Sequence, residues 1–478
     1  MGTSGLTAAS YLQSRKNHWD KIARKIGASV SWGGAYHRRL IEVFRFWVAP
    51  GQRILEVGCE QGDLLAALRP ARGVGVDFSS EMLRHARQSH PDIEFVEADG
   101  HDLEMIERPF DIIILSDLID DLWDVQMVLE QIKRLCHHHT RIIINSHSRV
   151  WEPLLFTARK LKVAKPMLPQ NWLTVEDVSN LLNLSGFEVI RSWEEVLWPL
   201  RTPFINQLCN KCLVKVWPFK LFAMTNFIMA RPCPEKPLDN HLVSVIVAAR
   251  NEAGNIAQIF TRTPEMGAGT ELVFVEGHSQ DDTYSAIERE IAAHPERKSQ
   301  LHRQEGVGKG DAVRLGFAKA KGDVLMILDA DMTVPPEDLP RFYEALRSGR
   351  GEFINGVRLV YPMEKDAMRV FNFLGNKFFS LAFSWLLGQP IKDTLCGTKV
   401  LTKQDYALIA ANRQHFGDFD PFGDYDLIFG AAKLGLKMID LPIRYRARTY
   451  GSTNIQRWSH GWLLLRMVTF AAKRIKFT

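Results

Sequence analysis

The chain has 478 residues, which at about 100–200 residues per domain indicates two or three domains. Its hydrophobic content of 46% and charged content of 24% are ordinary for a globular protein. A chain this long can bury sizeable cores, so it needs no disulfide or metal for stability. The net charge of +5 is compatible with anionic ligands or a membrane surface and identifies neither.

The cysteine and hydropathy patterns bear on localisation. Six sparse and irregularly spaced cysteines argue against a disulfide framework and favour a reducing compartment. The N-terminus lacks the basic-then-apolar pattern of a signal peptide. No segment offers the ~20 uncharged apolar residues of a membrane span. We therefore expect a cytoplasmic protein, with peripheral attachment to the inner face of the membrane as an option.

Short apolar runs alternate with helical patterns along most of the chain, which predicts βαβ units, parallel sheets and an α/β fold. The alternation begins twice, with RILEVGC at 53–59 and with LVSVIVAARNE at 242–252. Between them, RPCPEKPLDN at 231–240 has three prolines and mixed charge, as is typical of a linker. We predict two doubly wound domains, with these bounds: 1–232, with helices over 1–50; a linker at 233–241; and 242–478.

The first half opens with a strand that runs into a glycine-rich turn. ILEVGCEQGDLL at 54–65 contains Glu56, Gly58 and Gly62, and glycines there allow a tight turn and a close approach to a ligand. The next strand ends in Asp77. An acidic residue about 20 positions after such a turn is placed to bind a ribose diol.

Two more predicted strands also end in acids, Asp99 after 93–98 and Asp117 after 110–116. Ligands of open α/β sheets bind at the carboxyl ends of the strands, so these acids should converge on one crevice. A dinucleotide site would prefer G-x-G-x-x-G, and Glu56 would repel a pyrophosphate. A cationic sulfonium suits an acidic crevice better.

Residues from about 20 to 190 resemble the class I S-adenosylmethionine-dependent methyltransferases. The resemblance implies a seven-stranded Rossmann-like sheet that binds S-adenosylmethionine through these residues: Glu56, Gly58, Gly62, Asp77 for the ribose, Asp99 for the adenine, and Asp117 in the fourth-strand motif. The methyl acceptor is unknown. A hydroxyl acceptor would need a base, for which His147 and His37 are candidates, although each is also a plausible ordinary histidine. A binding module without catalysis is the alternative for this half.

The second half also places polar residues at strand ends. The strand at 271–275 leads to Glu276, and Gly308-Lys309-Gly310 opens a helix whose amides and lysine suit phosphates. The first predicted strand of this half, within 242–252, ends in three further polar residues: Arg250, Asn251 and Glu252.

The segment VLMILDADMTVPPEDL, 324–339, is the most informative. A buried strand ends in Asp329 and Asp331, two carboxylates separated by one residue. Such a pair can bind Mg²⁺ or Mn²⁺, which prefer oxygen ligands and keep substrate phosphates in their coordination shell. We expect both aspartates to be metal ligands and catalytic residues.

Residues 242–455 resemble the family 2 inverting glycosyltransferases with the GT-A fold, and within them the polyprenyl-phosphate sugar transferases of the dolichyl-phosphate mannose synthase type. The resemblance implies a nucleotide-sugar donor, bound through the following residues: Arg250, Asn251, Glu252, Glu276, Lys309 and Asp329. Gln456-Arg457-Trp458 lacks the spacing of the Q-x-x-R-W signature, which speaks against a processive synthase.

The acceptor determines the remaining catalytic residues. A hydroxyl acceptor needs a base, which Asp424 or Asp426 could provide. A polyprenyl phosphate is already anionic and needs cations instead, for which four arginines are candidates: Arg358, Arg369, Arg446 and Arg448. Ordinary surface arginines are the alternative for each.

Two apolar, aromatic segments, 378–388 and 460–477, could lie in the headgroup region of a membrane, the second as a basic amphipathic helix. Packed core helices are the alternative. The favoured function is a bifunctional enzyme whose glycosyl acceptor is a polyprenyl phosphate. The rival is a transferase to a soluble sugar or glycan. No nucleic-acid partner is expected, because the first half lacks a basic stripe with interleaved aromatic residues.

Overall fold

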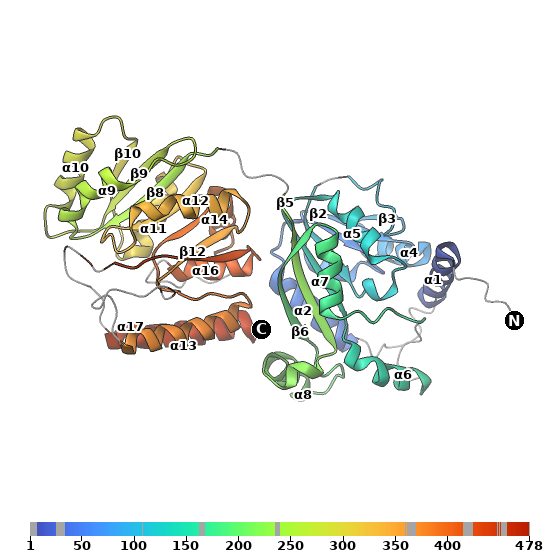
Figure 1. Ribbon diagram of the computed structural model, residues 1–478. Helices are drawn as coiled ribbons and strands as arrows, with labels where there is room; N and C mark the ends of the chain where they lie inside the picture. The colour runs from blue at the N-terminus through green and yellow to red at the C-terminus, as the bar shows by residue number, and fades with distance from the viewer. Residues whose placement is uncertain are drawn as a thin grey trace. The chain divides into compact units, whose positions relative to one another are not determined.

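The computed structural model divides into two compact units, Met1–Cys233 and Pro234–Lys476 (Figure 1). The structure describes residues 7–24, 34–107, 109–161, 168–234, 240–358, 360, 370–413, 424–446, 448, 450 and 457–477. Within these ranges, residues 370–374, 376, 424 and 457–463 are described by their backbone only. The predicted linker at 233–241 lies partly outside the described residues.

The first unit is built on a seven-stranded sheet in the order β3-β2-β1-β4-β5-β7-β6. β1 pairs with β2 and β4 in parallel, whereas β7 runs antiparallel to both β5 and β6. The predicted seven strands are confirmed, and β7, the last strand of this unit in chain order, lies inside the sheet rather than at its edge. The strands are β1 (Arg53–Val57), β2 (Arg72–Asp77), β3 (Glu94–Glu97), β4 (Phe110–Ser116), β5 (Cys136–His147), β6 (Phe187–Glu195) and β7 (Thr225–Pro232).

Helices lie on both faces of this sheet (Figure 1). Side-chain caps fix several helix starts, as where the Asp124 carboxylate accepts the Met127 amide hydrogen at 3.0 Å. The helices are α1 (Ala8–Ala23), α2 (Gly34–Trp47), α3 (Asp63–Ala67), α4 (Ser80–Ser89), α5 (Val125–Lys133), α6 (Glu152–Lys160), α7 (Val175–Leu184) and α8 (Ile205–Gln207). Shorter turns are η1 (Ile119–Asp121), η2 (Arg149–Trp151), η3 (Leu208–Cys212), η4 (Leu213–Lys215) and η5 (Phe219–Phe222).

The strands of this sheet are apolar on both faces because each face has its own core. Ile54 packs in one core with Phe44 and Phe227, and its neighbour Leu55 packs in the other with Val128. Successive side chains of a strand point to opposite faces, so a continuous apolar run indicates a sheet that is covered on both sides. The doubly wound α/β class predicted from these runs is therefore confirmed.

One stretch of the sheet departs from regular strand pairing. The histidines at 137–139 belong to β5. Phe110 pairs with Cys136 and Ile112 already pairs with Arg141, so β5 accommodates the extra residues as an irregularity in its register. The His137 ring lies 3.2 Å from the Asp111 carboxylate, and the Thr140 hydroxyl donates to the Phe110 carbonyl at 2.7 Å. These contacts hold the extra residues against β4.

The second unit has a seven-stranded sheet in the order β10-β9-β8-β11-β13-β12-β14. β8, β9, β10 and β11 are parallel, whereas β13 runs antiparallel to β11 and β12. The strands are β8 (Val243–Ala249), β9 (Thr270–Glu276), β10 (Ser299–Arg303), β11 (Val324–Asp329), β12 (Phe353–Val357), β13 (Lys399–Thr402) and β14 (Met438–Pro442).

Helices also flank the second sheet, and its largest core contains side chains from β8, β9, β11 and α12. The helices are α9 (Ile256–Arg262), α10 (Thr283–Ala293), α11 (Lys309–Lys319), α12 (Leu339–Arg347), α13 (Val370–Leu387), α14 (Lys403–Ala411), α16 (Asp424–Lys433) and α17 (Arg457–Ala471). Shorter turns are η6 (Ala253–Asn255), η7 (Pro336–Asp338) and η8 (Ala472–Lys476).

The two apolar segments noted in the sequence form α13 and α17, which lie side by side in this unit (Figure 1). α13 buries Phe383 and Leu387, while Phe378, Leu381 and Trp385 form an exposed stripe on its other side. α13 is therefore packed on one side and apolar on the side that faces outward. Among the described helices, none has the length and hydropathy needed to cross a bilayer.

The buried strand β7 provides a test of the core of the first unit. Phe227 is fully buried and its ring lies 5.2 Å from that of Trp193. Phe227→Ala should lower the free energy of unfolding by about 3–5 kcal/mol because it leaves a cavity between two packed layers. Urea denaturation followed by circular dichroism measures this change.

Leu184→Ala is the matched control, because Leu184 is 62% exposed in the same unit and its substitution should change stability by less than about 0.5 kcal/mol. Equal effects of the two substitutions would contradict the packing described here.

Candidate functional sites

The glycine-rich turn after β1 brings the backbone close to the neighbouring side chains. Gly58 and Gly62 have φ of 75° and 74°, in the left-handed region that favours glycine. A Cβ on Gly62 would lie 2.5 Å from the Phe95 ring, and one on Gly58 would lie 2.8 Å from Leu118. The turn therefore requires both glycines for conformation and for space.

Asp77, at the end of β2, is tied to this turn. Its carboxylate accepts the amide hydrogens of Glu60 at 3.0 Å and Ser79 at 2.8 Å. Burial raises the pKa of Asp77 to about 7, although both amide hydrogen bonds act to lower it. Asp77 thus holds the turn in shape, and the pKa of its carboxyl group lies close to neutral pH.

Glu56 is the most unusual carboxyl group of this turn. It is buried, and its Oε2 atom has no hydrogen-bond partner. Burial, with the nearby acidic Glu60 as a further cause, raises the pKa of Glu56 well above its usual range. A buried acceptor without a partner costs free energy, and a cationic ligand would remove that cost. Glu56 is therefore suited to a positively charged group placed against this turn.

Asp99 lies beyond the end of β3 and is oriented by a histidine. Its Oδ1 atom accepts the backbone amide of His101 at 3.0 Å and lies 2.6 Å from the His101 Nδ1 atom. The other ring nitrogen accepts the Asp124 amide at 3.1 Å, which fixes the proton of a neutral ring on Nδ1. Burial tends to raise the pKa of Asp99, but the His101 hydrogen bonds hold it below its usual value.

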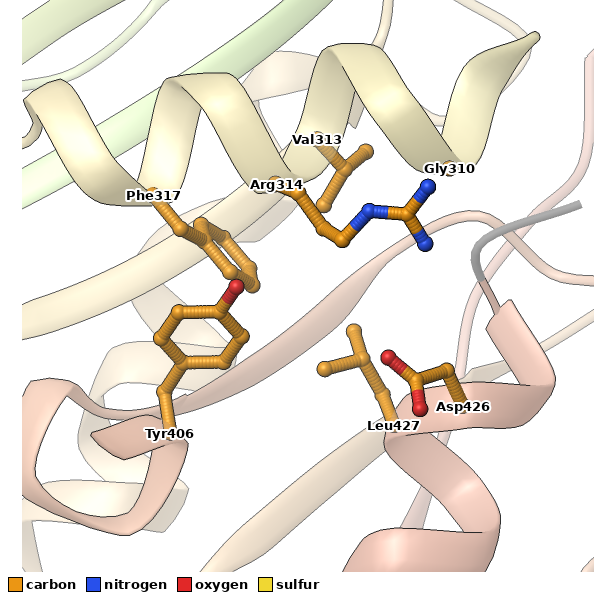
Figure 2. A pocket seen from close by; sticks show the side chains of 7 residues that line it. All are labelled: Gly310, Val313, Arg314, Phe317, Tyr406, Asp426 and Leu427. Carbon is orange, nitrogen blue, oxygen red and sulfur yellow. The ribbon is translucent and has the colours of Figure 1, made fainter. Parts of the chain in front are cut away.

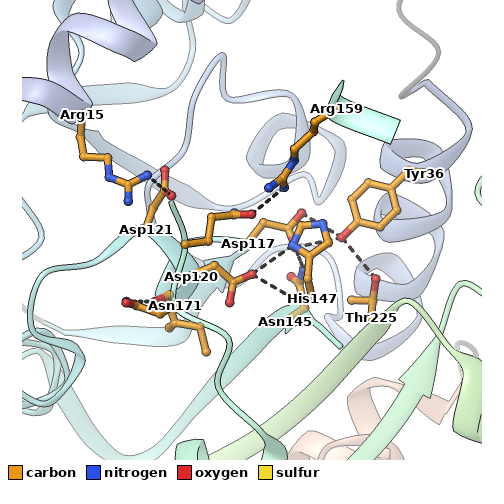
Figure 3. A network of polar contacts seen from close by, with 12 residues as sticks. Arg15, Tyr36, Asp117, Asp120, Asp121, Asn145, His147, Arg159, Asn171 and Thr225 are labelled. Carbon is orange, nitrogen blue, oxygen red and sulfur yellow. Dashed lines mark hydrogen bonds and ion pairs between the residues drawn. The ribbon is translucent and has the colours of Figure 1, made fainter. Parts of the chain in front are cut away.

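A buried polar cluster occupies the ends of β4 and β5 (Figure 3). The Tyr36 hydroxyl donates to the Asp117 carboxylate at 2.9 Å, and the Asn145 amide donates to the same Oδ1 atom at 2.7 Å. Burial raises the pKa values of both Tyr36 and Asp117. Tyr36 and Asn145 could not be assigned to this cluster from sequence patterns, because only the fold brings α2 and β5 next to Asp117.

His147 joins the cluster through Asp120. Its Nδ1 atom lies 3.0 Å from the Asp120 Oδ2 atom, which also accepts the His147 backbone amide at 3.0 Å. Burial acts to lower the pKa of His147, but the charges of Asp117 and Asp120 raise it overall. His147 therefore has the orientation of a general base, whereas His37 is exposed beside the Tyr36 ring.

In the second unit, Asp329 at the end of β11 lies in an ion pair. Its Oδ1 atom is 2.6 Å from the Lys309 Nζ atom, at the start of α11. Burial tends to raise the pKa of Asp329, but Lys309 holds it below its usual value. A Cβ on Gly397 would clash with both the Asp329 carboxylate and the Lys309 Nζ atom. The sequence did not single out Gly397 for this close approach.

Asp331 is paired with a different cation. The Arg448 guanidinium donates to the Asp331 carboxylate at 2.7 Å and to the Glu252 carboxylate at 2.9 Å. Glu252 also accepts from the Asn255 amide at 2.7 Å. Each carboxylate of the D-x-D pair therefore has its own basic partner, and the structure brings Glu252 to the same place.

The other predicted nucleotide-binding residues lie on the loops that follow β8 and β9. The Asn251 side-chain oxygen accepts the Gln280 amide hydrogen at 2.7 Å. Asn251 has a φ of 57°, in the left-handed region that usually favours glycine. Glu276 accepts the Ser279 amide at 2.5 Å. Arg250 is exposed beside them. These contacts tie the two loops together at the carboxyl end of the sheet.

Two of the predicted arginines are already engaged. The Arg358 guanidinium donates to both Asp393 oxygens at 2.7 and 2.8 Å, with an exposed fraction of 11%. Arg448 bridges the two acids described above. Arg446 is exposed, and its backbone amide donates to the Thr333 carbonyl at 3.0 Å. Arg369 lies outside the described residues.

Asp426 lines a small pocket between α11, α14 and α16 (Figure 2). It accepts a hydrogen bond from Arg413 at 3.0 Å, and it reaches toward the pocket opposite Arg314. The side chain of Asp424 lies outside the described residues. The pocket is lined by Gly310, Val313, Arg314, Phe317, Tyr406, Asp426 and Leu427.

Family models match both units. Residues 54–139 match the methyltransferase domain model, and residues 244–403 match the glycosyl transferase family 2 model. Each match covers the glycine-rich turn or the D-x-D strand described above.

Several curated proteins match the second unit. Glycosyltransferase AglJ of Haloferax volcanii is 28% identical over 46% of this chain and 69% of its own length. Dolichol-phosphate mannosyltransferases of Pyrococcus furiosus and Saccharomyces cerevisiae are 34% and 38% identical over 22% of this chain. The chain spans only 30% and 40% of the length of these two enzymes.

Solved structures match each unit separately. Magnesium protoporphyrin IX methyltransferase of Synechocystis PCC 6803, with bound SAH, is 15% identical over 47% of this chain and 97% of its own, with a TM-score of 0.33. Glucosyl-3-phosphoglycerate synthase of Mycobacterium tuberculosis, with Mn²⁺ and UDP, is 20% identical over 49% of this chain and 80% of its own, with a TM-score of 0.37.

The methyltransferase domain model therefore matches within the first unit and the glycosyl transferase family 2 model within the second, each over a seven-stranded α/β sheet with polar residues at its strand ends.

Proposed function

We propose that this chain is a bifunctional enzyme that transfers a methyl group from S-adenosylmethionine and transfers a sugar, with inversion, from a nucleotide sugar to a polyprenyl phosphate. The observation that carries the glycosyl transfer is the pair Asp329 and Asp331, each held by its own cation at the end of β11. Strand-end carboxylates with adjacent cations suit a metal-bridged diphosphate.

Asp329 and Asp331 would hold the divalent ion. In the described part of the chain, no group of three or more His, Cys, Asp or Glu side chains is placed to hold a metal. Mg²⁺ commonly binds one or two carboxylates and completes its shell with water and substrate phosphates, so two aspartates fit. When bound, the ion would neutralise charge that develops on the leaving diphosphate.

Lys309 and Arg448 would change partners when the donor binds. Both cations now neutralise the D-x-D carboxylates, at 2.6 and 2.7 Å. A divalent ion on those carboxylates would replace this neutralisation and free the basic groups for phosphate oxygens. The tied loops that carry Arg250, Asn251 and Glu276 would hold the nucleoside.

A lipid-linked acceptor has two supports. The relatives named above include dolichol-phosphate mannosyltransferases, and a further match, 35% identical over 22% of this chain and 34% of its own length, is the undecaprenyl-phosphate 4-deoxy-4-formamido-L-arabinose transferase of Edwardsiella ictaluri. The exposed stripe of Phe378, Leu381 and Trp385 on α13 suits a lipid surface. This enzyme would therefore work as a peripheral protein at the membrane.

The acceptor phosphate would be held by arginine. Arg446 is exposed. It lies near the loop that carries Asp331, since its backbone amide donates to the carbonyl of Thr333. Arg358 would act by holding Asp393 rather than by meeting the phosphate, since both ends of its guanidinium fork are engaged. A phosphate needs no base, whereas a soluble hydroxyl acceptor would need one, and Asp426 would then be the candidate.

The first unit would bind S-adenosylmethionine over the turn after β1. Glu56 would face the cationic end of the cofactor, Asp77 the ribose and Asp99 the adenine. The cluster of Asp117 and His147 would lie at the acceptor, where His147 can accept a proton because Asp120 orients its ring.

Removal of the metal provides the first test. Glycosyl transfer should stop in chelator and return with Mn²⁺ or Mg²⁺. Asp331→Asn should reduce the rate roughly 100-fold or more, because the charge of the leaving diphosphate loses its support. Asp338→Asn is the control, since Asp338 lies near the same loop and pairs only loosely with Arg341, at 3.6 Å. Full activity in chelator would exclude a metal role.

The acceptor class is tested by product analysis. The full chain, incubated with a panel of nucleotide sugars and polyprenyl phosphate, should yield a glycosylated lipid phosphate that mass spectrometry detects in the lipid extract. The Asp331→Asn variant should yield none. Transfer only to water-soluble sugars would contradict the lipid acceptor and favour a soluble-glycan transferase.

Binding of S-adenosylmethionine tests the first unit. Asp77→Asn should weaken binding by about 1.5–3 kcal/mol, as expected when a hydrogen bond to a charged group is lost. Isothermal calorimetry measures the affinity, and Asp92→Asn, at an exposed carboxylate of the same unit, should leave it unchanged. Unchanged affinity in Asp77→Asn would remove the ribose role of Asp77.

A further inference from the structure

One end of the first unit exposes an unusual concentration of apolar side chains, which lies outside both sites described above. Figure 1 shows α6 and α8 at the same end of this unit. Two segments, 150–161 and 200–222, contain about half of the large exposed hydrophobic side chains in the described part of the chain. Those more than half exposed are Val150, Leu154, Phe156, Leu161, Phe204, Leu208, Trp217, Leu221 and Phe222. We call these two segments the α6–α8 surface.

The two segments form one surface. The Trp151 indole donates to the Phe222 carbonyl at 2.8 Å, which joins the start of α6 to η5. The underside of the second segment is firmly attached to the unit. Asn210 is buried and exchanges hydrogen bonds with the Trp198 backbone at 2.8 Å, and Val214 is fully buried. The exposed apolar side chains are thus presented by an ordered segment that the unit's own core leaves uncovered.

The charged side chains of the longer segment, 200–222, are all basic. Residues 196–222 contain four basic residues and no Asp or Glu. Lys215 and Lys220 pair with Glu195 and Glu194. Two basic side chains, Arg201 and Lys211, have no ion pair among the described side chains. On α6, the exposed Lys160 lies 4.6 Å from the Phe156 ring centroid.

This combination selects among possible partners. Phe204 and Trp217 are 87% and 72% exposed to water. Exposing apolar side chains to water costs free energy, and burying them in an apolar phase would remove that cost. Aromatic rings beside lysine and arginine are typical of segments that lie in the headgroup region, where anionic lipid attracts the basic groups. An anionic bilayer therefore satisfies both the apolar and the charged parts of the surface.

The surface also adjoins the buried cluster of Figure 3. η2 and α6 follow β5 directly after His147, and the Ser148 amide donates to the Met224 carbonyl at 2.7 Å, just beyond η5. A bilayer bound at the α6–α8 surface would therefore lie near the edge of the sheet that carries His147.

We propose that the methyltransferase unit docks on anionic lipid bilayers through the α6–α8 surface. This proposal goes beyond the lipid acceptor of the glycosyltransferase unit and does not depend on it, because the surface belongs to the first unit alone.

Vesicle flotation of the full chain tests the proposal. The vesicles contain phosphatidylcholine and phosphatidylglycerol and no polyprenyl phosphate, so that a glycosyl acceptor cannot provide the anchor. The triple variant Phe204→Ser, Trp217→Ser and Phe222→Ser should lower the vesicle partition coefficient at least about tenfold, because three large apolar anchors are lost. Met105→Ser with Leu184→Ser is the matched control, since both residues are more than 60% exposed elsewhere in the unit.

A second variant keeps the test independent of folding. Arg201→Glu with Lys211→Glu removes no apolar side chain and should also weaken flotation, with the difference from the parent shrinking at high salt. Unchanged affinity for SAH in both variants would establish that the unit remains folded.

Three outcomes would overturn the proposal. The triple variant could float as well as the parent. Flotation could be lost only in Phe378→Ser with Leu381→Ser on α13, which would assign membrane binding to the glycosyltransferase unit and leave its lipid acceptor standing. Light scattering could show a dimeric parent and a monomeric triple variant, which would make the surface an interface between two copies of this chain.

Discussion

Carboxylates gathered at the ends of parallel strands impose the main physical constraint on both units. A buried carboxylate loses its hydration, so it must be neutralised by a proton, by hydrogen bonds or by a cation. In the second unit, Lys309 and Arg448 provide the cations for Asp329 and Asp331. Lys309 thereby holds the pKa of Asp329 below its usual value, and under the proposed function a metal ion would take the place of both basic side chains.

The first unit meets the same constraint with few cations. Asp77 depends on two backbone amides, and one oxygen of Glu56 has no partner at all. Burial raises the pKa of Asp77 to about 7 and that of Glu56 well above its usual range, so protonation competes with the ionised form of each group. A ligand with permanent positive charge resolves this competition. The difference between the two units thus matches the difference between the cationic cofactor and the anionic donor that are proposed for them.

Much of this arrangement could be predicted from the sequence, because each strand-end acid directly follows a continuous apolar run. Asp77 and Asp329 were found in this way. The partners could not be found, since Arg448 reaches Asp331 from 117 positions along the chain. Tyr36 contacts Asp117 only because α2 packs against the sheet, and no local sequence pattern predicts a contact between residues so far apart in the chain.

Other features were missed because sequence periodicity does not describe them. The antiparallel strands β7 and β13 read as ordinary apolar runs, whose direction is set by the pairing of the whole sheet. The longer segment of the α6–α8 surface, 200–222, contains apolar residues in short helical turns, without the spacing of a long regular helix or a strand. Its exposure could be recognised only once the core of the first unit was known.

Proton exchange on cofactor binding tests this electrostatic account most directly. Calorimetry of the full chain with S-adenosylmethionine, repeated near pH 7 in buffers of different ionisation enthalpy, measures the protons taken up or released. Burial raises the pKa of Asp77 to about 7 and that of Glu56 well above its usual range, and a positive ligand favours the ionised form of each, so binding should release protons. Glu56→Gln should reduce the release. Proton uptake, or a binding enthalpy independent of the buffer, would contradict the account.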